Sequence, residues 1–218
     1  MFRLAGALLV AALLGAMDRP GTPIGFAEGW QTQGFLFKRA NDYTATDRRL
    51  RVASDGAVSL YWRRLPPGLW DTGAASWRWQ VEAGVPATDL SREGGDDRNL
   101  ALYFVFLPET EARRLADAPV TRLLRTDAVR VLMYVWGGSG PEGRLVPSPY
   151  MDGHGMSIIA RQAGTGSGEM TADLAADHER AFDAEPGVLV GLAVSADSDD
   201  TDSRIRAQIS DLHLQEGG

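Results

Sequence analysis

The chain has 218 residues, of which 44% are hydrophobic and 23% are charged, and its formal net charge is -7. This composition is typical of a single globular domain with an apolar core. Because phosphate recognition requires a concentrated basic surface, we expect no nucleic-acid partner. The sequence contains no cysteine. Disulfides, thiolate nucleophiles and zinc–thiolate sites are therefore excluded, and the core alone must stabilise the fold.

The N-terminus has the pattern of a secretory signal. Arg3 supplies a positive charge, and the apolar run Leu4–Leu14 follows it. The run is shorter than the roughly 20 residues that a membrane span needs. We therefore expect a periplasmic or secreted protein with no membrane span after signal removal. An uncleaved anchor and a buried N-terminal helix are the alternatives.

Two positions suit cleavage of this signal. One lies after Ala16, close to the apolar run, and the other lies after Ala27, in the sequence Gly25-Phe26-Ala27. The sequence does not decide between them, so the predicted signal peptide is placed within residues 1–27. Residues 28–218 are predicted to form one β-sandwich domain.

Apolar and polar residues alternate after residue 30, and clusters of Gly, Pro, Asp and Ser separate the alternating segments. A period of two predicts β-strands. The predicted strands are Gly34–Lys38, Leu50–Ser54, Val58–Arg63, Ser76–Glu82, Leu100–Leu107, Val129–Trp136, Met156–Arg161, Val188–Ser195 and Arg204–Ser210. Helices are predicted at Pro108–Ala116 and Thr171–Phe182, and a flexible loop at Gly164–Gly168. Many short strands with few helices predict an all-β fold, an antiparallel β-sandwich or jelly roll with one or two short helices.

The predicted strand that ends at Glu82 carries two tryptophans on one face. Trp77, Trp79 and Val81 share that face, because side chains alternate across a strand. We expect both tryptophans in the core, where large aromatic side chains are mostly buried. Arg78 and Glu82 lie on the opposite face.

The strand Val129–Trp136 also has two distinct faces. Val129, Val131, Met133 and Val135 form a purely apolar face, which we expect to point into the core. The opposite face would join those of neighbouring strands in one polar-aromatic surface that contacts a ligand. This predicted ligand surface consists of Arg78, Gln80, Glu82, Tyr103, Arg130, Tyr134 and Trp136.

Several short motifs occur in a fixed order along the chain. They are Trp77-Arg78-Trp79, Asp96-Asp97, Tyr103-Phe104-Val105-Phe106, Tyr134-Val135-Trp136-Gly137 and Asp197-Ser198-Asp199-Asp200-Thr201. This order resembles the bacterial exported family called domain of unknown function 3047, and the resemblance covers residues 29–214. The chain departs from the family pattern at Leu102 and at Glu169-Met170, where an arginine and a tryptophan are common. The resemblance implies a jelly roll similar to galactose-binding and other carbohydrate-binding modules, and it implies no known reaction.

The adjacent acids Asp96 and Asp97 are the first candidate site. They could contact a ligand or bind calcium, which prefers hard oxygen ligands. The commoner role of such a pair is to hydrogen-bond the local backbone of a turn. Adjacent residues of a strand point to opposite faces, so two such carboxylates rarely act on one atom.

The acidic run Asp197–Asp202 is the second candidate site. It imitates the first half of an EF-hand loop, but Asp202 replaces the required glycine and Gln208 replaces the bidentate glutamate. An irregular calcium loop through Asp197 and Asp199 is one interpretation. A solvated hairpin loop between the strands on either side is the commoner one. We expect no cofactor other than such a calcium ion.

Histidine and serine patterns give no catalytic signature. The three histidines lack metal-binding spacing, and His154 is the general base that we would choose if one were needed. The glycine-rich segment 164–168 lacks the strand–turn–helix context of a serine nucleophile.

These observations favour a non-catalytic module that binds a glycan or a similar polar ligand in the cell envelope. Its site would combine the predicted ligand surface with Asp96 and Asp97. One alternative is a glycoside hydrolase or lyase that pairs Asp96 or Asp97 with a carboxylate of residues 197–202 across a cleft. A structural or protein-interaction domain is the other alternative.

Overall fold

The computed structural model describes residues 21–123 and 125–217. Most of the predicted signal peptide, residues 1–20, lies outside the described residues. Two β-sheets dominate the structure, so the predicted all-β sandwich is confirmed. None of the helices within the described ranges has the length and apolar character of a membrane span.

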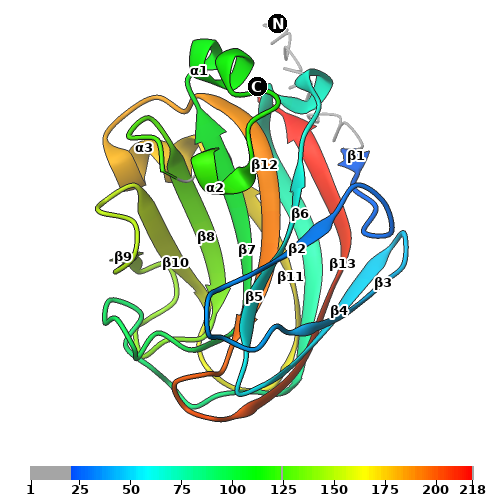
Figure 1. Ribbon diagram of the computed structural model, residues 1–218, viewed down its shortest axis with the longest axis vertical. Helices are drawn as coiled ribbons and strands as arrows, with labels where there is room; N and C mark the ends of the chain where they lie inside the picture. Colours follow the sequence, from blue (N-terminus) through cyan, green and yellow to red (C-terminus); the bar gives the residue numbers. More distant parts are fainter. Residues whose placement is uncertain (1–20, 124, 218) are drawn as a thin grey trace, which may run out of the picture.

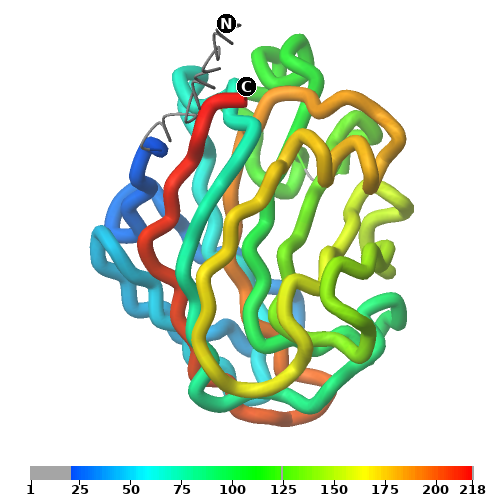
Figure 2. Tube along the Cα trace, turned by 180° about the vertical axis from the view of Figure 1, so that it is seen from behind, coloured from blue at the N-terminus to red at the C-terminus, as the bar shows by residue number. Residues whose placement is uncertain are grey.

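Sheet A lies on the side that faces the reader in Figure 2, where β13 in red runs beside β6 and β11. Its strand order is β11-β6-β13-β4-β3, and β1 pairs with β13. The strands are β1 (Thr22–Pro23), β3 (Asp42–Ala45), β4 (Arg49–Asp55), β6 (Thr72–Ala83), β11 (Gly166–Asp173) and β13 (Arg204–Glu216).

Sheet B lies toward the reader in Figure 1. Its strand order is β2-β5-β12-β7-β8-β10-β9, and the β8–β10 pair is parallel within an otherwise antiparallel sheet. The strands are β2 (Gln31–Gly34), β5 (Val58–Arg64), β7 (Arg98–Leu107), β8 (Arg130–Trp136), β9 (Leu145–Pro147), β10 (Gly155–Arg161) and β12 (Val188–Asp197). The short helices are η1 (Pro67–Leu69), α1 (Glu109–Arg114), α2 (Val120–Leu123) and α3 (Leu174–Phe182).

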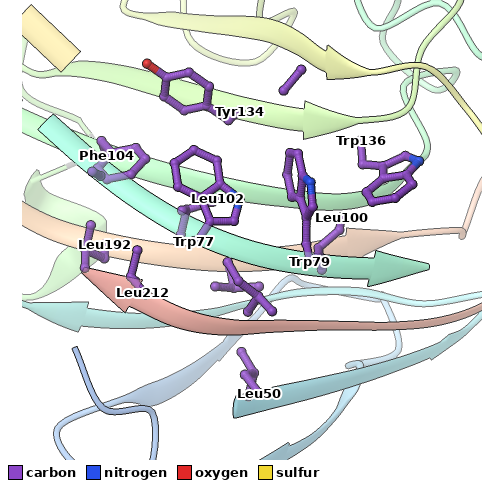
Figure 3. Close-up of a cluster of buried hydrophobic side chains, with 14 of the residues drawn as sticks. Leu50, Trp77, Trp79, Leu100, Leu102, Phe104, Tyr134, Trp136, Leu192 and Leu212 are labelled. Atoms are coloured by element: carbon purple, nitrogen blue, oxygen red, sulfur yellow. The ribbon is translucent and has the colours of Figure 1, made fainter. Parts of the chain in front are cut away.

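The main core fills the space between the two sheets. Trp77 and Trp79 of β6 point into it, as predicted, and their rings meet edge to face at 5.5 Å between centroids. Tyr134 packs edge-on against Trp77 at 5.4 Å, and Trp136 packs against Trp79 at 5.5 Å (Figure 3). Such aromatic pairs stabilise a core by about 1 kcal/mol each beyond their buried area.

A second apolar cluster covers the outer face of sheet B. It contains the face of β8 formed by Val129, Val131, Met133 and Val135. This face therefore points away from sheet A, and the prediction that it lines the inter-sheet core is wrong. Both faces of β8 are largely buried, including the face that carries Tyr134 and Trp136. The alternation of side chains therefore separates the two faces, but it does not show which face packs against sheet A.

Three segments differ from the sequence prediction. Of the segment predicted as a strand at Gly34–Lys38, Gly34 ends β2 and the rest is a turn. Most of the predicted loop and helix start forms the edge strand β11, which begins at Gly166. Helix α3 begins only at Leu174, where the Asp173 carboxylate caps it by accepting from the Ala176 N–H. The run Asp197–Asp202 connects sheet B to sheet A, so it is not a hairpin loop.

Residues 21–27, which precede Glu28, belong to the sandwich. β1 pairs with β13, and the Ile24 N–H donates to the Leu212 carbonyl at 2.8 Å. Phe26 is fully buried, and its ring lies 5.3 Å from that of Trp30. Cleavage after Ala27 would therefore remove core side chains.

Candidate functional site

A cleft of about 500 Å³ opens on the outer face of sheet B. This volume lies within the usual range for small-molecule sites, about 300–1,000 Å³. The floor is formed by apolar side chains of β5, β7, β8, β12 and α2, which are Leu60, Trp62, Val105, Leu123, Val131, Met133, Val190 and Ala193, and loop residues such as Phe35 and Leu36 add to the rim. The cleft therefore has an apolar floor formed by the strands in the middle of the sheet.

One end of the cleft is polar and centres on Arg98, the first residue of β7. Its Nη1 donates to the Asp96 carboxylate at 2.9 Å and to the Asp197 carboxylate at 3.2 Å, and its Nη2 donates to the Tyr103 hydroxyl at 2.8 Å. The Tyr103 hydroxyl also pairs with the Ser195 hydroxyl at 3.0 Å. Burial lowers the pKa of Arg98, but Tyr103, Asp197 and Asp96 outweigh this effect and raise the pKa above its usual value.

Asp97 lies behind this polar end and is fully buried. Its carboxylate accepts hydrogen bonds from the N–H of Asp200 at 3.3 Å, and from the N–H and hydroxyl of Thr201 at 2.8 and 2.5 Å. The commoner interpretation of Asp96-Asp97, a purely local turn, is therefore wrong for Asp97. Its partners lie more than 100 residues away in the sequence and form the other acidic segment; both loops lie at the lower end of the sandwich in Figure 1.

Asp197 is a buried acid on the wall of the cleft. Burial raises its pKa to about 9, and the nearby carboxylates of Asp199 and Asp96 add to this effect while Arg98 opposes it. In the ionised form, the Asp197 Oδ1 accepts no hydrogen bond from any of the described residues. When protonated, the group donates to Asp199. The pKa of Asp197 is therefore raised beside an Asp199 whose pKa is lowered.

Asp199 is held ionised by its neighbours. Burial raises its pKa, but the hydrogen bond from Asp197 and the ammonium of Lys38 lower it below the usual value. Lys38 forms an ion pair with Asp199 from the turn after β2. The sole lysine of the chain is thus part of the cleft wall.

The acidic cluster has donor atoms that could hold a metal ion. One carboxylate oxygen from each of Asp97, Asp197 and Asp199 lies within 4.8 Å of the others. Carboxylate oxygens are the ligands that calcium prefers. The unpartnered Oδ1 of Asp197 fits such a role, because either a proton or a cation would satisfy it.

The predicted ligand surface does not exist as one surface. Tyr134 and Trp136 are buried between the sheets, where the Tyr134 hydroxyl donates to Asp177 at 2.5 Å. Arg78 and Glu82 lie on the outer face of sheet A, on the far side of the molecule from the cleft, and Arg78 forms an ion pair with Glu169 at 2.5 Å. The single shared surface is therefore wrong, because β8 presents its polar-aromatic face to sheet A.

Arg130 is also remote from the polar end of the cleft. It lies opposite Phe106 in the β7–β8 register, whereas the start of β7 lies opposite Trp136. Its Nη1 contacts His154 Nδ1 at 2.9 Å. Of the predicted ligand residues, Asp96 and Tyr103 line the cleft, and Asp97 supports its wall.

Sequence reasoning missed Arg98, Lys38 and Trp62. Arg98 had a visible signal, since it is a charged residue at the start of a strand that is otherwise almost wholly apolar, directly after two acids. Lys38 also had a visible signal, because it is the sole lysine of the sequence. Trp62 had none, because alternation alone does not distinguish a cleft face from a core face.

The sequence matches the family model described as "Protein of unknown function (DUF3047)" over residues 28–213. The chain belongs to the DUF3047 family. This confirms the resemblance that its motifs indicated. Among curated proteins, none matches this DUF3047 chain.

Two solved structures with distant similarity to the DUF3047 chain are carbohydrate-active domains by their descriptions. The xyloglucanase domain of NopAA, a type three effector from Sinorhizobium fredii in complex with cellobiose, has a TM-score of 0.48 at 12% identity, covering 86% of this chain and 93% of that one. The family 11 xylanase from Neocallimastix patriciarum has a TM-score of 0.44 at 12% identity, covering 89% and 98%. At these scores we draw nothing about ligand or activity from them.

Proposed function

We propose that this protein binds, without converting it, a small amphipathic molecule with an apolar body and a hydroxyl-rich, sugar-like end. The observation that carries the proposal is the junction in one cleft of an apolar floor and the cluster of Arg98, Asp96, Asp197 and Tyr103. Such a pairing of apolar lining with a few fixed polar groups is how ligand sites set both affinity and orientation.

The floor of the cleft favours an apolar body. Val131, Met133 and Val190 present only hydrocarbon or thioether surface there. Burying one methylene group of a ligand against such a floor contributes about 0.8 kcal/mol. A purely polar glycan would leave this surface without a partner.

The polar end favours a head group with many hydroxyls. Carboxylates accept hydrogen bonds and the Arg98 guanidinium donates them, so a hydroxyl can serve both at once. Tyr150 on the rim adds a phenol that donates to Asp96 at 3.0 Å. Trp62 and Tyr103 also line the cleft, and aromatic rings pack well on the apolar faces of sugars.

Titration with alkyl glucosides below their micelle concentration tests this proposal, with heat or tryptophan fluorescence as the readout. We expect octyl glucoside to bind roughly tenfold more tightly than hexyl glucoside, because two more methylenes are buried. Met133→Gln should weaken the octyl compound, and Tyr103→Phe should weaken both. Arg78→Ala on sheet A is the matched control and should change neither affinity. The proposal is wrong if the affinity does not depend on alkyl length. It is also wrong if Arg78→Ala abolishes binding.

A glycoside hydrolase is the second candidate, and the meeting of the two acidic loops favours it. Asp96 and Asp197, one from each loop, contact the same Arg98 guanidinium, and burial raises the pKa of Asp197, as a general acid requires. Incubation with aryl glycosides of several sugars distinguishes the two functions. Turnover that Asp197→Asn removes, with ligand binding kept, would assign catalysis to the cleft.

Calcium at Asp97, Asp197 and Asp199 is a separate proposal. Its support is the 4.8 Å cluster and the unpartnered Oδ1 of Asp197. Calcium would displace the proton of Asp197, so its affinity should rise with pH. The thermal midpoint should increase with calcium over EDTA in the wild type and not in Asp199→Asn. Equal shifts in both proteins would point to calcium elsewhere.

A further inference from the structure

The turn between β2 and β3 carries three consecutive large apolar side chains on the surface. Phe35, Leu36 and Phe37 are 45%, 81% and 95% exposed. The connection crosses in front of sheet B in Figure 1, and Phe35 and Leu36 line the cleft. Single exposed apolar residues are ordinary, but a contiguous exposed group bordered by charged residues marks a contact surface.

The turn geometry makes this exposure more unusual. The Lys38 N–H donates to the Phe35 carbonyl at 3.2 Å, which makes Phe37 the third residue of a four-residue turn. Phe37 has φ of 63°, in the left-handed region that favours glycine. A bulky residue there is strained, and its side chain gains almost no packing inside the molecule in return. Strain combined with exposure indicates that the side chain acts outside the molecule.

We propose that this turn inserts into the interfacial layer of a lipid bilayer, with Leu36 and Phe37 as the inserted side chains. Three residues at the tip of a turn are far too few for a stable protein interface, which needs about 800 Å² from each partner. A few apolar side chains do suffice for reversible membrane binding, especially beside basic residues. Arg39 follows the turn closely, is exposed and suits a lipid phosphate, whereas Lys38 is already paired with Asp199.

The position of the turn gives the insertion a consequence for the cleft. Because Phe35 and Leu36 form part of its rim, docking would bring the mouth of the cleft to the bilayer surface. An amphipathic ligand could then pass between bilayer and cleft without crossing water. Docking itself does not rest on the proposed ligand, since it needs only the turn.

Flotation of the mature protein with phosphatidylcholine vesicles, with and without phosphatidylglycerol, tests this inference. We expect the wild type to float with the vesicles and Phe37→Gly to partition at least about tenfold more weakly, because a large apolar side chain is lost. Glycine suits the left-handed backbone, so Phe37→Gly should keep or raise the thermal midpoint. Leu36→Ser is a second variant that leaves the strained position untouched and should also weaken flotation.

Two controls separate insertion of the turn from adsorption through another exposed side chain and from binding in the cleft. Arg78→Ala changes a side chain that is 59% exposed on the outer face of sheet A, away from both the turn and the cleft, and it should float like the wild type. Tyr103→Phe should weaken the cleft ligand and leave flotation unchanged. A wild type that does not float, or a Phe37→Gly that floats equally well, overturns the inference. So does a dimer that Phe37→Gly dissociates in the absence of lipid binding, because the turn would then serve a second copy.

Discussion

Burial changes the ionisation of Asp197, a residue of the cleft wall, and this change should be visible in the pH dependence of stability. Its pKa rises from the ordinary 3.8 to about 9 in the folded state, chiefly through burial. Between these two values the folded protein binds one more proton than the unfolded chain, so the free energy of unfolding falls as pH rises. We expect Asp197→Asn to remove this part of the slope, because asparagine resembles the neutral acid in shape. Chemical denaturation from pH 4.5 to 8.5 measures it.

The matched control for this prediction is Asp199→Asn. Asp199 has a lowered pKa, so it contributes stability that is present above its unfolded value and lost as pH falls. Asp197→Asn should therefore change the profile between about pH 4 and 9, whereas Asp199→Asn should leave the slope above pH 4.5 nearly unchanged and act only at lower pH, near and below the ordinary pKa of 3.8. Parallel profiles for wild type and Asp197→Asn would mean that Asp197 is ionised at neutral pH, and the hydrolase candidate would lose its acid.

Trp136 was predicted to lie on a ligand surface, but it is a core residue. It is buried between the sheets, with its ring 5.5 Å from that of Trp79. We expect Trp136→Ala to reduce the free energy of unfolding by about 3–5 kcal/mol, as for other large aromatic core residues. Arg78→Ala, on the exposed face of sheet A, should change it by less than about 0.5 kcal/mol. Urea unfolding compares them; a stable Trp136→Ala would place this side chain on a surface.

The N-terminal segment matters most at the scale of elements. β1, Ile24 and Phe26 all add to the sandwich ahead of Glu28. We propose cleavage after Ala16, because cleavage after Ala27 would leave Phe26 and its neighbours out of the core. A chain that begins at Met17 should be more stable than one that begins at Glu28 by more than about 3 kcal/mol. Mass spectrometry of the exported protein gives the cleavage site directly, and an N-terminus at Glu28 would contradict us.

The strands themselves were largely predictable, whereas their orientation was not. Alternation located β4, β5, β7, β8, β10 and β12 close to their observed bounds, and it located β6 and β13 although β6 begins four residues earlier and β13 ends six residues later than predicted. It failed for β11, whose sequence Gly-Ser-Gly-Glu has weak strand propensity and becomes a strand only by pairing with β6. It also could not orient β8, because both faces of that strand are apolar. The candidate site was likewise predicted only in part. The two acidic segments could be recognised in the sequence, but their contact could not, because it depends on the order of strands in the two sheets.

At the scale of the whole molecule, a buried carboxylate links the two sheets at the lower end of the sandwich. Asp97 immediately precedes β7 of sheet B, and its three hydrogen bonds hold the segment that links β12 of sheet B to β13 of sheet A. The same contact places Asp197 and Asp199 beside Arg98 and Lys38. Asp97 therefore contributes to both fold closure and cleft assembly, together with the hydrogen bonds that join Ser198 to Ser54 and Ala57.

Asp97→Asn should expose this dependence, because an amide has one acceptor oxygen where the carboxylate has two. We expect a loss of about 3 kcal/mol of stability, since hydrogen bonds to a buried charge are lost. Amide exchange should speed up in residues 198–203 more than in β6, and affinity in the cleft should fall with it. Thr201→Val removes one of the three hydrogen bonds and should give a smaller effect of the same kind. Asp97→Asn could instead lose stability without any change in amide exchange of residues 198–203 or in cleft affinity. In that case the two loops are positioned independently of each other, and the sheets alone determine the shape of the cleft.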